Sequence, residues 1–326
     1  MYRKAFKFGI CLVLMLTVIA SPLMAGDKPL RKVRFGVSYI PNVQFAPVYV
    51  AQEKGFYAAE GLEVAVEYGY ENDFVALAAQ GEREFALGSG DQVILAQSQG
   101  IPIIYVMKWH QRYPVALMAP QSKKITKVKD LIGKSVGIPG FFGASYVGWK
   151  ALVYTAGLDE SQVTVKQIGF TQASAIQQNI VDSAIVYVVN EPIQLRNAGI
   201  EVDVIEVSDY IDLVSNGLLV GEKLIKSDPN LVKRMVKATM KGLTYSIANP
   251  QEAFAISRKI IPEITDEAAP VQYQVLLASA KLWESEKMGV STRKSWEDSV
   301  EFMQKTGLLT NPVTVDKLYD NQFVEE

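Results

Sequence analysis

Aromatic rings and neutral amides gather in five short stretches of the chain, each directly after an apolar run typical of a β-strand. Rings stack on other rings, and each such contact contributes about 1 kcal/mol beyond the buried area. Asn and Gln amides pair a donor with an acceptor, which matches the edge of a pyrimidine-like ring. The pattern predicts a site for a flat, mostly neutral heteroaromatic ligand. The candidate ligand-binding residues are Tyr39, Asn42, Gln44, Ser89, Asp91, Trp109, Tyr113, Phe141, Gly143, Ser145, Tyr146, Tyr187, Asn190 and Glu191.

The candidates differ in how strongly the sequence supports them. Asp91 and Glu191 could accept hydrogen bonds from ring or amino N–H groups or from hydroxyls of a ligand. The stretch around Ser89 and Asp91 is also a common turn from strand to helix, a weak signal by itself. Rings beside Gly or Pro in turns are expected to face the site, whereas the other rings could equally well pack in the hydrophobic core. The rings expected to face it are Tyr39, Trp109, Phe141 and Tyr146, and those that fit the core equally well are Phe45, Tyr68 and Phe85.

A predicted helix begins at Gly143, Ala144 and Ser145, where backbone N–H groups and a hydroxyl are free. Such a helix start can bind a phosphate or a carboxylate. No Lys or Arg stands in the same loop. The sequence therefore favours an ordinary helix cap, or a contact to a neutral oxygen, over an anion site.

An enzymatic reading finds little support in the residues. His110 is the only histidine, and a lone histidine is more often structural than catalytic. The chain has no His/Cys cluster for zinc, no phosphate-binding P-loop and no Gly-x-Ser-x-Gly nucleophile motif. We therefore expect a binding protein that needs no metal and no cofactor.

Two runs of alternating strands and helices must position these residues, and they predict an α/β fold with two mostly parallel sheets. In the first run, strands are expected at residues 33–39, 62–68, 85–88 and 103–107, and helices at 46–58, 74–80 and 91–99. In the second run, strands are expected at 135–138, 163–169, 184–188 and 202–206, and helices at 144–155, 173–179 and 191–197. Two lobes of this kind place a cleft between them, with the carboxyl ends of the strands facing it.

Two extended stretches, residues 113–119 and 215–220, are expected to carry the chain across between the lobes as hinges. Further helices are expected at 230–247, 251–261, 267–284 and 294–306, packed back on the first lobe. The predicted division is a signal peptide at residues 1–25, a discontinuous lobe 1 at 26–119 and 217–326, and lobe 2 at 120–216.

The first residues have the order of an export signal. Arg3, Lys4 and Lys7 precede an apolar run, and small residues near Ala25 offer a cleavage site. An uncleaved anchor is the alternative. Removal of this segment, with three cations and no acids, changes the net charge from -2 to about -5 and removes the single cysteine, Cys11. A mildly acidic surface gives no indication of nucleic acid as a partner.

Several motifs resemble the solute-binding proteins of ABC importers in the superfamily that binds thiamine pyrimidine precursors and sulfonates. They are Tyr39-Ile40-Pro41-Asn42, Phe45-Ala46-Pro47-Val48-Tyr49, Lys54-Gly55-Phe56-Tyr57, Gly88-Ser89-Gly90-Asp91-Gln92, Gly133-Lys134-Ser135-Val136-Gly137 and Leu318-Tyr319-Asp320-Asn321. The resemblance extends over essentially the whole exported chain. It implies the type II periplasmic binding protein fold, with two α/β lobes, a central cleft and two hinge crossings.

Within that superfamily the chain resembles most the riboflavin-binding branch. Pyrimidine-precursor binders tend to have a histidine where Gln44 or Phe45 stands, and the related synthases use a cysteine-rich motif; this chain has neither. The resemblance implies a monomeric, exported protein, periplasmic or at the cell surface, that closes on riboflavin and delivers it to a membrane permease with its ATPase. The thiamine pyrimidine precursor, and after it a sulfonate, are the alternative ligands.

Overall fold

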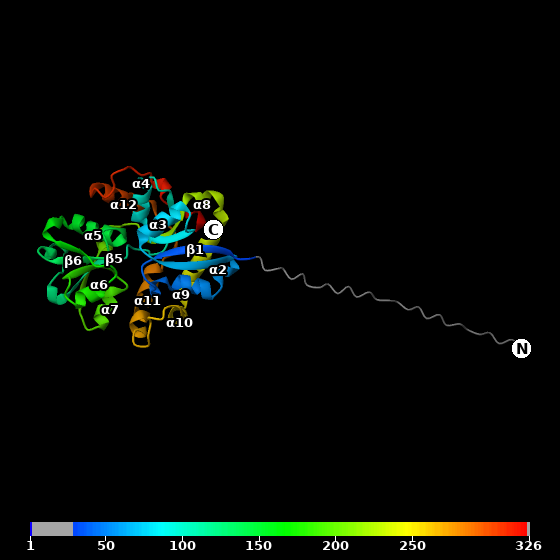
Figure 1. Cartoon of the computed structure of the whole chain (residues 1–326), viewed down its shortest axis with the longest axis horizontal. Coiled ribbons are helices and arrows are strands. Elements are labelled where there is room, and N and C mark those ends of the chain that lie inside the picture. Colours follow the sequence, from blue (N-terminus) through cyan, green and yellow to red (C-terminus); the bar gives the residue numbers. More distant parts are fainter. Residues whose placement is uncertain (2–28, 325–326) are drawn as a thin grey trace.

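The protein has two lobes, each built on a five-stranded sheet (Figure 1). The computed structural model describes Met1 and residues 29–324. Lobe 1 contains the sheet β2-β1-β3-β10-β4, and lobe 2 the sheet β7-β6-β8-β5-β9. The strands of lobe 1 are β1 (Arg31–Ser38), β2 (Leu62–Gly69), β3 (Phe85–Ser89), β4 (Ile103–Lys108) and β10 (Asn216–Gly221). Those of lobe 2 are β5 (Val115–Pro120), β6 (Ser135–Ile138), β7 (Thr164–Gln167), β8 (Ser183–Tyr187) and β9 (Val202–Glu206).

Each sheet is parallel except for one strand that enters from the other lobe. β1 pairs in parallel with β2 and β3, and β10 lies antiparallel between β3 and β4. In lobe 2, β6 pairs in parallel with β7 and β8, and β5 lies antiparallel between β8 and β9. The chain therefore crosses between the lobes just before β5, at residues 109–114, and just before β10, at residues 207–215.

This pairing corrects the lobe boundary drawn from the sequence between residues 119 and 120. β5 pairs with β8 and β9, so the whole strand belongs to lobe 2. Its six residues are all buried, and a fully apolar strand carries no signal of which sheet it joins. The second predicted boundary, between residues 216 and 217, lies one residue after the start of β10, so Asn216 belongs to the lobe 1 sheet.

Helices cover both sheets, and their order follows the prediction with two differences. Lobe 1 carries α1 (Ala46–Glu53), α2 (Phe56–Ala59), α3 (Glu71–Gln80), α4 (Gly90–Ser98), α8 (Glu222–Ser227), α9 (Pro229–Ala248), α10 (Pro250–Ile260), α11 (Ala269–Trp283) and α12 (Arg293–Lys305). Lobe 2 carries α5 (Gly143–Ala156), α6 (Gln172–Gln177) and α7 (Glu191–Asn197). The helix expected at 46–58 is divided at Gly55, whose φ of 69° is unsuited to a helix interior. The six-residue α8 was not predicted because it is too short for a helical period to show.

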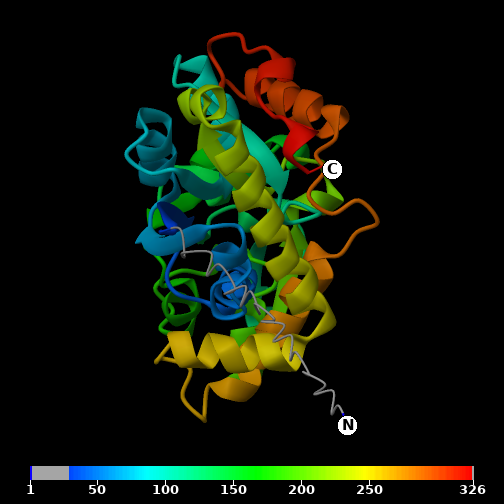
Figure 2. The same cartoon turned by 90° about the vertical axis from the view of Figure 1, so that its right-hand side faces the viewer.

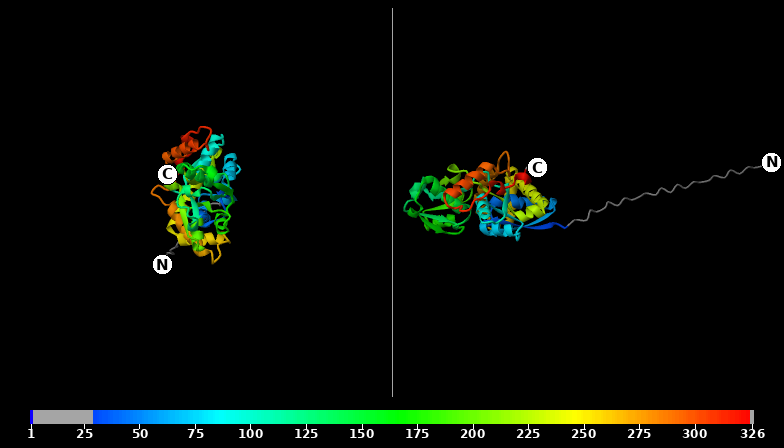
Figure 3. Two further views of the ribbon diagram at one scale, coloured as in Figure 1. Left: turned by 90° about the vertical axis from the view of Figure 1, so that its left-hand side faces the viewer. Right: turned by 90° about the horizontal axis from the view of Figure 1, so that it is seen from above.

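Helix α9 crosses the side of lobe 1 that faces away from lobe 2 (Figure 2). It begins where the Asp228 side chain accepts a hydrogen bond from the Leu231 N–H, with Pro229 at the first helical position. It packs closely on α1, because Gly242 has no side chain: a Cβ there would lie 2.1 Å from the Pro47 carbonyl oxygen. The later helices thus build lobe 1, while lobe 2 (green) lies beside it when the molecule is seen from above (Figure 3).

The predicted signal segment, residues 1–25, lies outside the described residues apart from Met1. Within the described part of the chain, no helix combines the length and the apolar character that a membrane span requires.

Candidate functional site

A cleft between the two lobes lies at the carboxyl ends of strands from both sheets. In this arrangement of the lobes the cavity enclosed by the cleft has a volume of about 90 Å³. Lobe 1 contributes residues directly after β1 and β2, and lobe 2 contributes residues after β6, β7 and β8. This is where α/β sheets bind ligands.

Half of the predicted site residues line this cleft. They are Tyr39, Gln44, Gly143, Ser145, Tyr187, Asn190 and Glu191. They come from three of the five predicted loops, one on lobe 1 and two on lobe 2. The structure thus brings together residues that are more than 150 positions apart in the chain.

Four of the other predicted residues are buried behind the cleft. Trp109 is fully buried and packs edge-on against Trp283 of α11, with ring centres 6.1 Å apart. Ser89 donates to Glu71, and the Tyr113 hydroxyl donates to Asp91 at 3.2 Å and to the Ala144 carbonyl at 2.8 Å. These are internal contacts, so the prediction that they bind ligand directly gains no support from their position.

Three further predicted residues point elsewhere. Asn42 accepts a hydrogen bond from the Gln44 N–H and thereby caps a short 3₁₀ helix. It lines a second hollow between the lobes, which adjoins the cleft because Tyr39, Phe170, Gln172 and Glu191 line both. Phe141 is 54% exposed and packs edge-on against Tyr146, outside the cleft. A ring beside a glycine in a turn can face solvent as readily as a ligand, which the sequence cannot distinguish.

The loops after β2 and β7 supply cleft residues that the sequence analysis missed. Tyr70 and Glu71 follow β2, and Phe170 and Gln172 follow β7. The rule that sheet ligands meet the carboxyl ends of parallel strands applied to these two loops as well. Their inspection would have found all four residues.

Two of these missed rings, Tyr70 and Phe170, make ring contacts across the mouth of the cleft together with Tyr39 and Phe142. Tyr39 of lobe 1 meets Phe170 of lobe 2 edge-on, with ring centres 4.9 Å apart. Tyr70 lies 5.1 Å from Phe170 and 5.4 Å from Phe142, both on lobe 2. Rings from both lobes therefore enclose the site, and the lobes are in contact around it.

Glu191 is the acidic group of the cleft on lobe 2. Its carboxylate accepts a hydrogen bond from the Tyr187 N–H at 3.1 Å and from the Asn190 side chain at 3.2 Å. The Tyr39 hydroxyl of lobe 1 also donates to it, at 3.5 Å. Burial raises the pKa of Glu191 to about 6, so the group remains ionised at neutral pH.

Glu71 is the acidic group of the cleft on lobe 1, with Asp91 behind it. Glu71 accepts hydrogen bonds from the Ser89 N–H and hydroxyl and, across the lobes, from the Ala144 N–H at 3.2 Å. Burial raises the pKa of Glu71. Burial and the nearby Glu71 carboxylate raise the pKa of Asp91 to about 7.

Two buried polar atoms of the cleft have no partner within the protein: Nδ1 of His110 and Oε1 of Gln172. Burial lowers the pKa of His110 to about 3, so its ring is neutral at pH 7. Buried polar groups are normally hydrogen-bonded, and unpaired ones mark positions where a ligand or water completes the bonding. Both atoms thus offer contacts to a neutral polar ligand.

Metal binding has no support in the part of the chain that the structure describes, where no group of three His, Cys, Asp or Glu side chains is arranged to hold an ion.

Comparison with known proteins agrees with this architecture. A family described as NMT1/THI5 like matches residues 42–253. The chain is 40% identical to the riboflavin-binding protein RibY of Chloroflexus aurantiacus, over 99% of this chain and 98% of that protein. It is 24% identical to the formylaminopyrimidine-binding protein of Halalkalibacterium halodurans, over 98% of this chain and 99% of that protein. A 4-amino-5-hydroxymethyl-2-methylpyrimidine phosphate synthase of Legionella pneumophila is 22% identical to the chain, over 93% of this chain and 95% of that protein.

The fold is that of periplasmic binding proteins. The aliphatic sulphonate-binding protein SsuA of Escherichia coli superimposes with a TM-score of 0.71 at 13% identity, covering 91% of this chain and 94% of that one. The predicted two-lobed α/β fold is thereby confirmed.

Proposed function

The chain belongs to the NMT1/THI5-like family, and from this we propose that it is the solute-binding component of an ABC importer and captures riboflavin. The observation that carries the proposal is the composition of the cleft. Aromatic rings from both lobes surround neutral polar groups, two of which lack partners within the protein. A flat isoalloxazine ring with donor and acceptor atoms on its edge and a polyhydroxy tail matches such a site. The name of the relative RibY supports the same ligand.

Capture proceeds by closure of the lobes. Tyr39 on lobe 1 contacts Asn190 and Glu191 on lobe 2, and Glu71 contacts the start of α5. These bonds exist only when the lobes are closed, so a ligand that touches both lobes favours the closed form. The closed form would then be recognised by a membrane permease, coupled to its ATPase. Export, by the signal segment at residues 1–25, and a monomeric state belong to this proposal.

A thiamine pyrimidine precursor is the second candidate ligand. Two relatives, one a binding protein and one a synthase, carry pyrimidines in their names. The amide of Gln172, whose Oε1 has no partner within the protein, would suit a pyrimidine edge equally well. A synthase activity has less support, because the chain has a single cysteine and a single, neutral histidine. A sulfonate is the least favoured ligand.

Thermal unfolding with a panel of ligands tests the proposal. The panel is riboflavin, flavin mononucleotide, the hydroxymethyl pyrimidine, thiamine, taurine and an alkanesulfonate. A ligand at a hundred times its dissociation constant stabilises the folded protein by about 2.7 kcal/mol, which raises the midpoint by a few degrees. We expect a shift with riboflavin. A shift with the pyrimidine alone would refute the flavin and retain the transport role.

Two substitutions test the position of the site. Asn190→Ala removes a cleft amide that bonds to Tyr39 of the other lobe, and should weaken riboflavin binding about tenfold. Tyr146→Ala removes a ring of α5 in the same lobe that packs on Phe141 outside the cleft, and should leave affinity unchanged. Equal effects of the two substitutions, measured by fluorescence titration, would contradict this placement.

A further inference from the structure

The charges that face the cleft are of one sign. Glu71 lines it from lobe 1 and Glu191 from lobe 2. Among the described residues that line the cleft, none is a lysine or an arginine, and the ring of His110 is neutral. A ligand in the cleft therefore meets two carboxyl groups and no cation.

The position where an anion would be expected to bind is already filled. The start of the fourteen-residue helix α5 faces the cleft at Gly143 and Ala144. Free N–H groups at a helix start attract phosphates and carboxylates. Here the Ala144 N–H donates to the Glu71 carboxylate, which also accepts both donors of Ser89. The carboxylate of Glu71 thus occupies the place of a phosphate.

The Glu71 carboxylate also fills the space next to the start of α5. A Cβ at Gly143 would lie 2.9 Å from an Oε of Glu71, so the carboxylate lies directly against the helix start. On the opposite side of the cleft, the Glu191 carboxylate accepts from Tyr187, Asn190 and Tyr39. Burial raises the pKa of both carboxyl groups, and the hydrogen bonds from N–H and O–H donors act in the opposite direction, in favour of the ionised form. Both carboxylates are held in place by bonds from the two lobes.

We infer that the cleft excludes anionic ligands, and that Glu71 and Glu191 are the residues that set this specificity. The inference rests on the proposed function and narrows it: the captured flavin is the uncharged vitamin and not its phosphate ester. A hydrolysis reaction must then supply the ligand from any phosphorylated form. Water cleaves the ester P–O bond, the phosphate keeps the oxygen of the water, and the vitamin leaves as the free alcohol. That reaction belongs to another protein, outside the cytoplasm.

Paired affinities test the inference. Dissociation constants for riboflavin and flavin mononucleotide are measured by fluorescence titration on the wild-type protein, on Glu71→Gln and on Glu191→Gln. We expect the phosphate ester to bind at least about a hundredfold more weakly to the wild type, because like charges are brought together in a desolvated site. Each substitution should reduce the ratio of the two dissociation constants, flavin mononucleotide over riboflavin, about tenfold, since it removes one carboxylate. Glu201→Gln makes the same charge change on the exposed surface of lobe 2 and should leave the ratio unchanged.

The outcomes separate this inference from the proposed function. Equal binding of the two flavins, within about threefold, would overturn the exclusion of anions and leave the flavin assignment intact. If neither flavin binds, the flavin assignment fails, and the ratio is measured with the hydroxymethyl pyrimidine and its monophosphate. Tight binding of that monophosphate, or of an alkanesulfonate, overturns the inference, and so does a panel in which no neutral ligand binds. The two substitutions act on different lobes, so a folding defect in one variant leaves the other as a test.

Discussion

At the scale of single residues, Glu191 links the binding site to the stability of the fold. Its pKa rises from 4.5 in the unfolded chain to about 6 in the folded protein, chiefly because it is buried. The folded protein therefore binds more protons than the unfolded chain between these values, and its stability falls as the pH rises through them. Above pH 6 the ionised, buried carboxylate costs about 2 kcal/mol of unfolding free energy relative to the protonated form.

Glu191→Gln should remove this dependence. We expect the free energy of unfolding of the wild type to fall by about 1–2 kcal/mol relative to the variant as the pH rises from 4.5 to 7. Urea denaturation at several pH values measures the difference, and subtraction removes the similar contribution of Asp91, whose pKa is also raised. If the free energy of unfolding depends on pH in the same way for wild type and variant, Glu191 has its ordinary pKa in the folded protein and this account is wrong.

Which residues reach the cleft could be predicted only in part. Tyr39 ends one predicted strand, Asn190 and Glu191 follow another, and all three line the cleft, because strand ends are fixed by local pattern. Trp109 follows a strand as well, but Trp283 covers it from a helix 174 positions later. No local pattern reports such a contact. Tyr70 and Phe170 were within reach of the same rule and were missed only because their loops were not considered.

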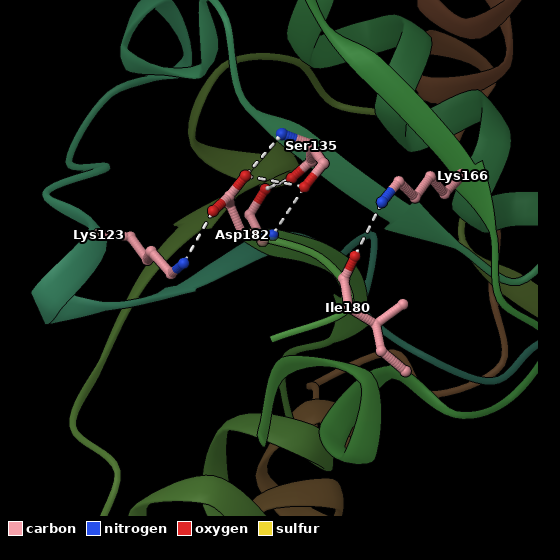
Figure 4. Close-up of polar contacts among 6 residues, drawn as sticks. Lys123, Ser135, Lys166, Ile180 and Asp182 are labelled. Atoms are coloured by element: carbon pink, nitrogen blue, oxygen red, sulfur yellow. Dashed lines mark hydrogen bonds and ion pairs between the residues drawn. The ribbon is translucent and has the colours of Figure 1, made fainter. Parts of the chain in front are cut away.

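At the scale of elements, the junction of β6 and β8 is held by one carboxylate (Figure 4). Asp182, directly before β8, accepts hydrogen bonds from the N–H and the hydroxyl of Ser135 at the start of β6. The Asp182 N–H donates back to the Ser135 hydroxyl, and Lys123 donates to the carboxylate at 2.8 Å. Lys166 of β7 bonds to the Ile180 carbonyl nearby. The loop before β8 is thus fixed to the strands beside it.

Asp182→Ala should destabilise lobe 2 by about 1–3 kcal/mol, because charge-assisted bonds are lost and the Ser135 N–H is left without its acceptor. Lys123→Ala removes only a partly exposed ion pair and should cost about 0–1 kcal/mol. The Lys123 ammonium and the Ser135 donors hold the pKa of Asp182 well below its usual range. The stabilisation of the folded protein by ionised Asp182 is therefore fully present above the unfolded pKa of 3.8, and it is lost progressively as the pH falls below that value. Denaturant unfolding that ranks the two variants in the opposite order would contradict this account.

Element order was predictable because strand and helix periods are local, whereas sheet membership was not. β5 is apolar along its whole length and fits either sheet by its pattern. Its place in lobe 2 is decided by pairing with β8 and β9, which come far later in the chain.

At the scale of the whole molecule, the lobes are connected by two crossings and touch around the cleft. The contacts of Tyr39 with Asn190 and Phe170 bridge the lobes at the mouth, and Asn197 of α7 bonds to Gln274 of α11 at 3.1 Å. Behind them, one hydrophobic cluster is continuous between the lobes, since it includes Val93 of α4 in lobe 1 and Val147 of α5 in lobe 2. Rotation about the two crossings would open the cleft by breaking the polar contacts at its mouth, while the apolar contact between α4 and α5 lies nearer the crossings' side of the interface and would have to shift with them.

Ligand binding should therefore shift an equilibrium between open and closed lobes. Gln177 of lobe 2 and Glu263 of lobe 1 are exposed and line a common hollow between the lobes. Spin labels on Gln177→Cys and Glu263→Cys report the distance between the lobes, and protein produced without residues 1–25 has no other cysteine to label. Riboflavin should shorten and narrow the distance distribution measured by pulsed electron paramagnetic resonance.

The control pair places both labels on lobe 2, at Gln177→Cys and Glu201→Cys, where closure changes nothing. Saturating ligand that leaves the distance between the lobes unchanged would show that the closed arrangement is already complete without ligand. A permease could then not distinguish the loaded protein by its shape, and the ligand itself would have to be recognised at the mouth of the cleft. A shortened distance with an unchanged control pair would instead identify the contacts of Tyr39 and Glu71 with lobe 2 as the features that distinguish the loaded state.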